Sequence, residues 1–151
     1  MLAGPIRHRR VRRTDFVAVV GVLSASGLPV PPPDRSLLRR FRRLASDLGT
    51  DFYVALAGER VVGFVHVTYA RQLATGMRGR VEALVVAPEA RRCGVGTSLA
   101  ALARRRAGRR GCDDLRCTPD LQREEVRPFL TRNGWRVEGE EFRVDLDDTA
   151  Q

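Results

Sequence analysis

The sequence predicts a single α/β domain built around a mixed β-sheet. Two observations support this prediction. The spacing of apolar residues changes from helical to alternating and back along the chain, which gives the element order β-αα-ββ-β-α-β-α-ββ. The chain has 151 residues, of which 43% are apolar, and this suits one domain with a sizeable core. We expect the domain to fill residues 1–151, with its core at about 6–146 and loose ends at 1–5 and 147–151.

The first predicted elements are an edge strand and a helix. Residues 6–13 form a short, highly charged run, which favours an edge strand over a buried helix. Thr14 or Asp15 can cap the helix that follows. Its apolar residues recur at helical spacing and are Phe16, Val19, Val20 and Leu23.

A second helix follows a loop that Gly27 and four prolines between residues 29 and 33 impose. Asp34 or Ser36 begins this helix, and Gly49 closes it. Its apolar stripe consists of Leu37, Phe41, Leu44 and Leu48. The stripe suits the protein core and the wall of a substrate site equally well, and the sequence leaves both interpretations open.

Three strands are predicted in the middle of the chain. Residues 51–69, "DFYVALAGERVVGFVHVTY", contain two β-rich runs around a tight turn at Gly58 and Glu59, which predicts an antiparallel hairpin. Residues 80–86, "RVEALVV", form a further strand that Pro88 ends.

A helix and a short strand come next. The helix runs from Gly94 to Ala107, and its inward residues are Val95, Leu99 and Leu102. The strand lies at residues 113–117.

The C-terminal part is predicted to hold one more helix and a closing hairpin. The helix covers about residues 121–132 and is interrupted or restarted at Pro128. The Asn-Gly pair at 133–134 ends it, because both residue types accept the left-handed conformation. The hairpin strands are expected at 135–137 and 142–146.

The charge of the chain narrows the class of partner. The formal net charge is +9, and all 27 basic residues are arginine. A single isoleucine and a single asparagine indicate a codon bias towards G and C, so most of the arginines are expected to be ordinary solvated surface residues. The excess still favours anionic partners, such as phosphates, nucleic acid or an acidic cofactor.

Three features bear on the compartment. No apolar run approaches the length of a membrane span, so no membrane partner is expected. The N-terminus lacks the apolar core of a secretory signal, which predicts a cytoplasmic protein. Cys93, Cys112 and Cys117 are odd in number and lack the spacing of metal ligands, so we expect free thiols and no metal.

The stretch "PEARRCGVGTSLAALARR", residues 88–105, predicts an anion site. The first turn of a helix has unpaired N–H groups and a partial positive charge. Gly94 and Gly96 let that backbone approach a phosphate closely and turn successive N–H groups inward. Arg91 and Arg92 add positive charge. We therefore predict a phosphate ligand here, and specifically a diphosphate.

The two common nucleotide motifs do not fit this loop. The Walker motif needs a lysine, which the chain lacks, and the dinucleotide fingerprint needs a third glycine where Leu99 stands. The pattern that does match is Arg-x-x-Gly-x-Gly, from Arg91 to Gly96, and it resembles the coenzyme A loop of the GNAT N-acetyltransferases.

The resemblance covers nearly the whole chain. "VEALVVAPEARRCGVGTSL" resembles the fourth strand, pyrophosphate loop and third helix of that family, and "VRPFLTRNGW" is similar to its distal A-x-P-F-Y-x-x-x-G-F segment. The resemblance implies a GNAT-like fold, in which a mixed, mostly antiparallel sheet with splayed central strands carries about four flanking helices. The splayed strands would be 80–86 and 114–117, with the acyl group between them.

The resemblance also implies which residues bind acetyl-CoA. Backbone groups of the fourth strand would pair with the pantetheine arm as an added strand would, and loop N–H groups would hold the pyrophosphate. The implied positions are Leu84, Val85, Val86, Arg91, Arg92, Cys93, Gly94, Val95, Gly96, Thr97 and Ser98.

The chain departs from the family pattern at two positions. Leu130 stands where the family has a tyrosine acid, and Arg123 stands where many members have an asparagine. The proton for the leaving thiolate must therefore come from water, from another side chain or from the product ammonium. Tyr53 and Tyr69 lie on other strands, and neither is the expected substitute.

Four other features have both a functional and a structural interpretation. Glu82 lies on the fourth strand where the acceptor amine should arrive, so it is a candidate base or amine-positioning residue as well as a candidate surface carboxylate. His66 is interpreted as a half-buried strand residue on the face of Phe64 and Thr68 rather than as a base. Cys93 is interpreted as a small loop side chain rather than a nucleophile, and the arginines of 104–110 as a solvated helix end rather than a contact to phosphate or nucleic acid.

The sequence thus predicts an N-acetyltransferase that moves an acetyl group from acetyl-CoA to a primary amine by direct transfer in a ternary complex. A small molecule, an amino acid derivative or a protein N-terminus is favoured as acceptor over a polycation, because the protein is itself cationic. The alternative is a catalytically weak GNAT-like module that binds acyl-CoA or nucleic acid as a regulator. Arginine is spread along the chain without an aromatic-rich motif, so nucleic acid is not the expected partner, and a homodimer is left open.

Overall fold

The computed structural model describes residue 2, residues 4–118 and residues 125–145 of the chain. The chain divides into two compact units, Met1–Thr118 and Pro119–Gln151, and each is described by itself. The prediction that the whole chain forms a single domain therefore stays a prediction.

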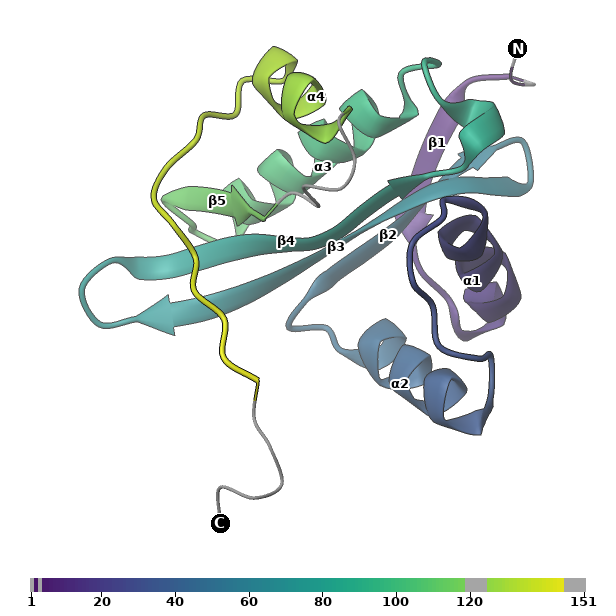
Figure 1. Cartoon of the computed structure of the whole chain (residues 1–151), viewed down its shortest axis with the longest axis horizontal. Helices are drawn as coiled ribbons and strands as arrows, with labels where there is room; N and C mark the ends of the chain where they lie inside the picture. The colour runs from purple at the N-terminus through teal and green to yellow at the C-terminus, as the bar shows by residue number, and fades with distance from the viewer. Residues whose placement is uncertain (1, 3, 119–124, 146–151) are drawn as a thin grey trace. The chain divides into compact units, whose positions relative to one another are not determined.

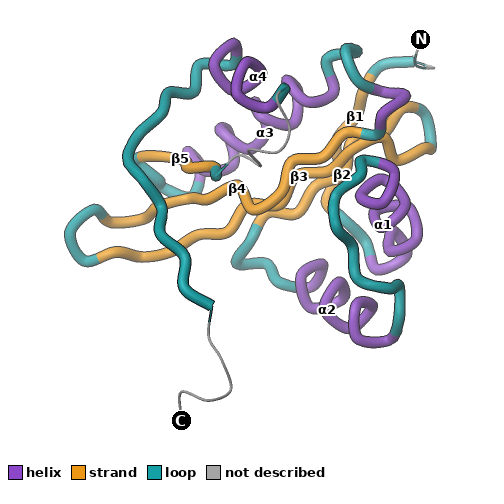
Figure 2. Tube along the Cα trace, in the orientation of Figure 1, coloured by secondary structure: helices purple, strands orange, loops and turns teal. Residues whose placement is uncertain are grey.

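The first unit is built on one five-stranded sheet (Figures 1 and 2). The spatial order of the strands is their order in the sequence, from β1 at one edge to β5 at the other. Neighbours pair antiparallel except for β4 and β5, which are parallel. The strands are β1 (Ile6–Arg10), β2 (Asp51–Ala57), β3 (Arg60–Gln72), β4 (Gly76–Val86) and β5 (Asp114–Cys117). This arrangement confirms the predicted mixed, mostly antiparallel sheet.

Three helices cover the two faces of this sheet: α1 (Phe16–Ala25), α2 (Arg35–Ser46) and α3 (Val95–Arg109). Figure 1 shows α1 and α2 on one side of the sheet and α3 on the other. On the α1/α2 face, aromatic rings follow one another at centroid distances of 5.5 to 5.9 Å, and they belong to Phe16, Phe41, Phe52 and Phe64. On the opposite face, α3 buries Val95 and Leu99 against β3. Together with the helix of the second unit, the described residues confirm the expected four helices.

The helix ends follow local hydrogen bonding. Asp34 caps α2 as predicted, because its carboxylate accepts the Leu37 N–H at 3.0 Å. Asp15 serves differently: its carboxylate accepts two hydrogen bonds from the Arg9 guanidinium and one from the Arg12 N–H, within a short 3₁₀ turn before α1. The predicted end of α2 was too late, since the helix stops at Ser46.

The predicted stripe of α2 is only partly core. Phe41 is buried, Leu37 and Leu44 are half-buried, and Leu48 lies beyond the helix with 74% of its surface exposed. Since Leu48 follows the C-cap residue Asp47, helical periodicity no longer determines which way it points.

Strands β3 and β4 extend further than the sequence predicted. Strand β3 continues past Tyr69, and strand β4 begins before Arg80. The two strands form a second hairpin, in which Gln72 pairs with Gly76. This extension carries exposed and half-buried residues instead of an apolar stripe, so periodicity alone gave no signal for it.

The second unit contains α4 (Val126–Arg132). Pro128 lies in its first turn, where no intrahelical N–H bond is lost, and Gly134 follows its end with φ of +85°. The part of the predicted helix at 121–124 lies outside the described residues.

The predicted closing hairpin was wrong for residues 135–145, which contain no strand. Trp135 is half-buried, but Val137, Phe142 and Val144 are 79–88% exposed, so residues 136–145 bury no apolar face. A two-stranded hairpin without such a face is marginal in water. Leu146, the last residue of the predicted hairpin, lies outside the described residues.

Candidate functional site

The loop between β4 and α3 has the backbone that the glycine pattern predicted. It opens with a 3₁₀ turn at Pro88–Ala90, which the Ala90 N–H closes on the Ala87 carbonyl at 2.9 Å. Arg92 then adopts φ of +61°, and Gly94, the N-cap of α3, adopts φ of +82°. Arg92 is the one non-glycine residue with positive φ among those described. A left-handed conformation costs a non-glycine residue about 1–2 kcal/mol, so the surrounding structure must hold this turn in place.

The same turn exposes a run of N–H donors. The first helical hydrogen bond of α3 runs from the Ser98 N–H to the Gly94 carbonyl at 3.0 Å. Across residues 4–118, no acceptor is found for the N–H groups of residues 92–97. Six successive donors at the positive end of a 15-residue helix form a concentrated anion site.

The first turn of α3 lies against a glycine that sequence analysis did not single out. A Cβ on Gly63 of β3 would lie 2.9 Å from the Val85 carbonyl oxygen and 3.2 Å from side-chain atoms of Val95 and Leu99. Gly63 therefore allows the helix to approach the sheet closely. An isolated glycine inside a strand is the signal that could have identified it.

The side chains of the loop are engaged to different degrees. The Ser98 hydroxyl donates to the Val95 carbonyl at 2.8 Å and lies 3.0 Å from His8 Nε2 of β1, which sequence analysis did not implicate. Burial and the nearby Arg105 lower the pKa of His8, so this imidazole is neutral near pH 7. The exposed Cys93 thiol lies 3.4 Å from the Arg91 carbonyl.

Strands β4 and β5 pair over only part of their length. The register pairs β5 with residues 78–81 of β4, and residues 82–86 extend beyond it. The Ala87 N–H donates to Val62 of β3 at 2.9 Å, so by alternation the backbone groups of Leu84 and Val86 face the opposite edge, while those of Val85 face β3. Two of the three strand residues predicted to bind a ligand thus present their amides at this edge.

Glu82 occupies a β-bulge at the end of the paired segment. His66 pairs with Ala83, and Val67 pairs with Val81, which leaves Glu82 as the extra residue. Alternation counted back from Leu84 would turn Glu82 towards α3, but the bulge places Glu82 and Ala83 on the same face, opposite α3. There the Thr68 hydroxyl donates to Glu82 Oε1 at 2.7 Å, and the Glu82 side chain remains exposed.

His66 lies on this same face and is more buried than expected. His66 is 7% exposed, and its ring packs on that of Phe52, with the two ring centroids 5.1 Å apart. Within the described part of the chain, Nε2 of His66 is buried and has no hydrogen-bond partner. Burial lowers the pKa of His66, and Arg10 lowers it further, while Glu82 and Asp47 act to raise it.

Tyr53 and Tyr69, neither of which was expected to replace the family's tyrosine acid, lie on the α3 face. The Tyr69 hydroxyl donates to the buried Asp51 at 2.6 Å, and burial together with this bond raises the pKa of Tyr69 strongly. The Arg106 guanidinium carbon lies over the ring of Tyr53, 5.8 Å from the centroid of that ring. Neither tyrosine shares the face of Glu82. Leu130 lies in α4 of the second unit.

Asp51 accounts for two arginines of the 104–110 run. The Arg106 and Arg110 Nε atoms donate to its carboxylate at 3.1 and 2.8 Å, and Arg10 lies 3.7 Å away. These two arginines are therefore structural ion-pair partners, in contrast to the predicted solvated helix end.

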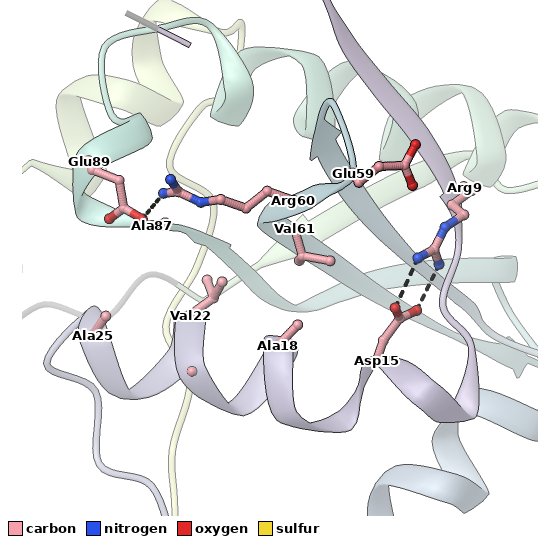
Figure 3. Close-up of a pocket in the computed structure, with 11 residues that line it drawn as sticks. Arg9, Asp15, Ala18, Val22, Ala25, Glu59, Arg60, Val61, Ala87 and Glu89 are labelled. Atoms are coloured by element: carbon pink, nitrogen blue, oxygen red, sulfur yellow. Dashed lines mark hydrogen bonds and ion pairs between the residues drawn. The ribbon is translucent and has the colours of Figure 1, made fainter. Parts of the chain in front are cut away.

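A surface pocket of about 410 Å³ lies between α1 and the β2–β3 turn (Figure 3). Two ion pairs flank it, Arg9 with Asp15 and Arg60 with Glu89, so four of its charged side chains are already engaged. Its α1 wall is made of small and apolar residues, and Glu82 and the loop donors lie outside it.

Two kinds of feature are absent from the described residues. No group of three His, Cys, Asp or Glu side chains among them could hold a metal ion. No helix in the described ranges is both long and apolar enough to cross a membrane.

Comparison with known proteins adds independent evidence. The sequence model of the family described as "Acetyltransferase (GNAT) family" matches residues 21–135. No curated protein matches the sequence.

Solved structures match along nearly the whole chain. A transcriptional regulator from Bacillus halodurans C-125 shares 26% identity at a TM-score of 0.85, covering 94% of this chain and all of that one. Glucosamine-6-phosphate N-acetyltransferase from Arabidopsis thaliana shares 15% identity at a TM-score of 0.79, covering 95% and 100%. An aminoglycoside acetyltransferase from an uncultured soil metagenomic sample shares 15% identity at a TM-score of 0.76, covering 94% and 97%. The last two are similar in fold alone.

Proposed function

Because the chain belongs to the acetyltransferase (GNAT) family, we propose that it transfers an acetyl group from acetyl-CoA to a primary amine within a ternary complex. The observation that supports this most directly is the run of six N–H groups at residues 92–97, for which the described residues offer no acceptor, next to the edge of β4 that β5 leaves unpaired. A diphosphate joined to an extended arm suits these two features together.

The cosubstrate would bind along the chain as follows. The pyrophosphate lies on the N–H groups of residues 92–97, with the charges of Arg91 and Arg92 beside it. The pantetheine arm runs along β4 and pairs with Leu84 and Val86, whose amides face the open edge. The thioester then lies near the bulge at Glu82, where β4 and β5 stop pairing.

Transfer requires a neutral amine, and Glu82 is the residue we assign to its deprotonation. The amine nitrogen attacks the thioester carbonyl carbon, its proton passes to Glu82 directly or through a water, and the C–S bond breaks to release the thiolate. Leu130 cannot supply the proton that the thiolate needs, so water or another side chain supplies it. The alkaline limb of the pH–rate profile that a tyrosine acid would give is therefore expected to be missing.

For the acceptor we favour a small amine, an amino acid derivative or a protein N-terminus. A chain with a net charge of +9 repels polycations unless its cleft is locally acidic. A cytoplasmic location and a homodimer stay predictions of the sequence.

The alternative function is an acyl-CoA-binding regulator with little catalysis. Two observations favour it: Leu130 replaces the family's tyrosine, and the solved structure with 26% identity is that of a transcriptional regulator. Both functions use the same loop, so turnover distinguishes them.

The decisive experiment is an acetyl-CoA turnover assay on a panel of amines, with coenzyme A affinity measured alongside. Gly94→Glu places bulk and negative charge among the loop donors and should weaken coenzyme A binding at least 10-fold. Gly108→Glu is the matched control, because it adds the same side chain at an open position of the same helix. Full affinity in a folded Gly94→Glu protein would show that the loop assignment is wrong. Tight coenzyme A binding without turnover on any amine would favour the regulator.

A further inference from the structure

The α1/α2 face of the sheet carries a polar cluster that a purely structural role does not explain. The cluster consists of His66, Thr68 and Glu82. Register brings them together, because Ala83 pairs with His66 and the bulge turns Glu82 to the same side. Thr68 already donates to Oε1 of Glu82, which leaves Oε2 available.

The unusual member of the cluster is His66. It is 7% exposed, and its Nε2 has no partner among the described residues. An unsatisfied buried polar atom costs about 1–3 kcal/mol, so a strand that needed only an aromatic ring here would be more stable with phenylalanine. The ring packing against Phe52 does not require a nitrogen.

We propose that His66 is a positioning residue for proton removal, which binds a water molecule at Nε2 and through it receives the proton that Glu82 takes from the acceptor amine. This inference rests on the proposed function. A buried water needs at least two polar partners, and Nε2 and the Glu82 carboxylate supply them.

The proton and electron balance of this step is simple. As the amine nitrogen attacks the thioester carbon, its N–H bond breaks and the proton passes to Glu82. The water then gives one proton to Nε2 and takes one from Glu82, which restores the carboxylate and forms an imidazolium. The sulfur leaves with the C–S electron pair and takes a proton from solvent, and the imidazolium returns its proton to solvent after the products leave. Nothing is oxidised or reduced.

The charges around His66 suit this role. Burial keeps the pKa of His66 below its usual value, so the imidazole is neutral and ready to accept a proton near pH 7. Once protonated, it faces the carboxylates of Glu82 on β4 and Asp47 after α2, which favour the cation, and Arg10 on β1, which opposes it. Phe52 is its neighbour on β2.

The test compares two His66 variants. His66→Phe keeps the ring that packs on Phe52 and removes the nitrogen, whereas His66→Gln keeps a polar group but cannot take up a proton. In each, kcat/KM for the amine at pH 7 should fall about 10²-fold, mostly in kcat, with unchanged acetyl-CoA affinity. The acid limb of the pH–rate profile should also shift. Phe52→Leu is the control: it disturbs the packing of the ring but should leave the acid limb in place.

A third His66 variant tests chemical rescue. Added imidazole should restore part of the activity of His66→Gly, and added pyrrole, a similar ring without the basic nitrogen, should not. A structural role predicts that both rings act alike.

NMR titration supplies a readout that requires no His66 variant. The chain has two histidines, so His8→Asn assigns their signals. Glu82→Gln should lower the titration midpoint of His66, because the Glu82 charge acts to raise it. An unchanged midpoint, or a His66→Phe enzyme with the wild-type kcat and pH profile, would overturn the inference while leaving the proposed function intact. If the wild-type protein acetylates no amine, the proposed function fails and this inference fails with it.

Discussion

Two carboxylates on the two faces of the sheet show how the same chemical group serves different ends. Asp51, on the α3 face, is 1% exposed and receives hydrogen bonds from Arg106, Arg110 and Tyr69. Glu82, on the α1/α2 face, is exposed and receives a hydrogen bond from the Thr68 hydroxyl. The carboxylate of Asp51 is saturated with donors, whereas that of Glu82 accepts one side-chain hydrogen bond among the described residues and is otherwise open to solvent.

The difference has a physical origin. A buried carboxylate must be compensated, so each donor around Asp51 offsets the cost of removing it from water. The Arg110 Nη2 atom also donates to the Leu48 and Thr50 carbonyls, so this cluster ties the end of α3 to the start of β2. At Glu82 water supplies the solvation, and under the proposed function an incoming amine would replace it. The first carboxylate is expected to govern stability, and the second is expected to govern activity.

The largest effect is expected from Asp51→Ala. Removing this carboxylate leaves Arg10, Arg106 and Arg110 facing one another without compensation, so the free energy of unfolding should fall by about 3–5 kcal/mol. Urea unfolding followed by circular dichroism measures it. The control is Glu59→Ala, whose side chain is 99% exposed, and its effect should stay within about 0.5 kcal/mol. Equal stabilities for the two variants would contradict the structural role of Asp51.

The second effect is expected from Glu82→Gln, which should reduce activity and leave stability unchanged. It keeps the shape of the side chain and removes its negative charge, so kcat/KM for the amine should fall about 10²-fold or more, with acetyl-CoA affinity little changed. The free energy of unfolding should stay within about 0.5 kcal/mol of wild type, because Glu82 is exposed.

Glu89→Gln is the matched control for this measurement. It neutralises an exposed carboxylate that is paired with Arg60 and lies in the 3₁₀ turn before the N–H donors of residues 92–97, and it should retain wild-type turnover. If Glu82→Gln runs at the wild-type rate, Glu82 has no part in the reaction.

The third effect concerns Gly63, where α3 packs closely on the sheet. A methyl group there would meet the Val85 carbonyl at 2.9 Å, so Gly63→Ala should cost about 1–3 kcal/mol of stability by overpacking. It should also weaken acetyl-CoA binding, because α3 must move away from the sheet and takes its N–H donors with it. Gly108→Ala, at an open position in the same helix, should instead stabilise the protein by about 0.5–1 kcal/mol. Thermal unfolding and a coenzyme A titration measure both variants, and opposite signs are the expected result.

The sequence predicted the features that depend on local pattern. The order of the elements as far as α4, the sheet edge at β1 and the turn at Gly94 follow from periodicity, charge and glycine chemistry, and all are observed. The family match confirms the resemblance that the loop and the distal segment indicated.

The features that the sequence did not predict depend on contacts distant in the chain. The bulge at Glu82 depends on the register between β3 and β4, and the role of Gly63 appears only when α3 packs on it. The ion pairs of Asp51 with Arg106 and Arg110 join residues 55 and 59 positions apart, and no local pattern marks them. The hairpin predicted after residue 134 failed for the opposite reason: its pattern was local, but residues 136–145 are exposed and bury no apolar face.

The smallest expected effect is the pH dependence of stability that Asp51 contributes. Burial alone would raise the pKa of the Asp51 carboxyl, but hydrogen bonds from Arg110, Tyr69 and Arg106 outweigh burial and hold that pKa below its usual value. The folded state therefore binds this proton less readily than the unfolded state, whose aspartate pKa is about 3.9. The resulting stabilisation is complete above about pH 5 and is lost as the pH falls towards the folded-state pKa. Asp51→Asn removes this titration, so its free energy of unfolding should fall less steeply than that of wild type between about pH 5 and pH 3. Urea unfolding at half-unit pH steps measures both slopes. Parallel curves would mean that the surrounding arginines do not hold Asp51 ionised, and the contrast with Glu82 would then rest on burial alone.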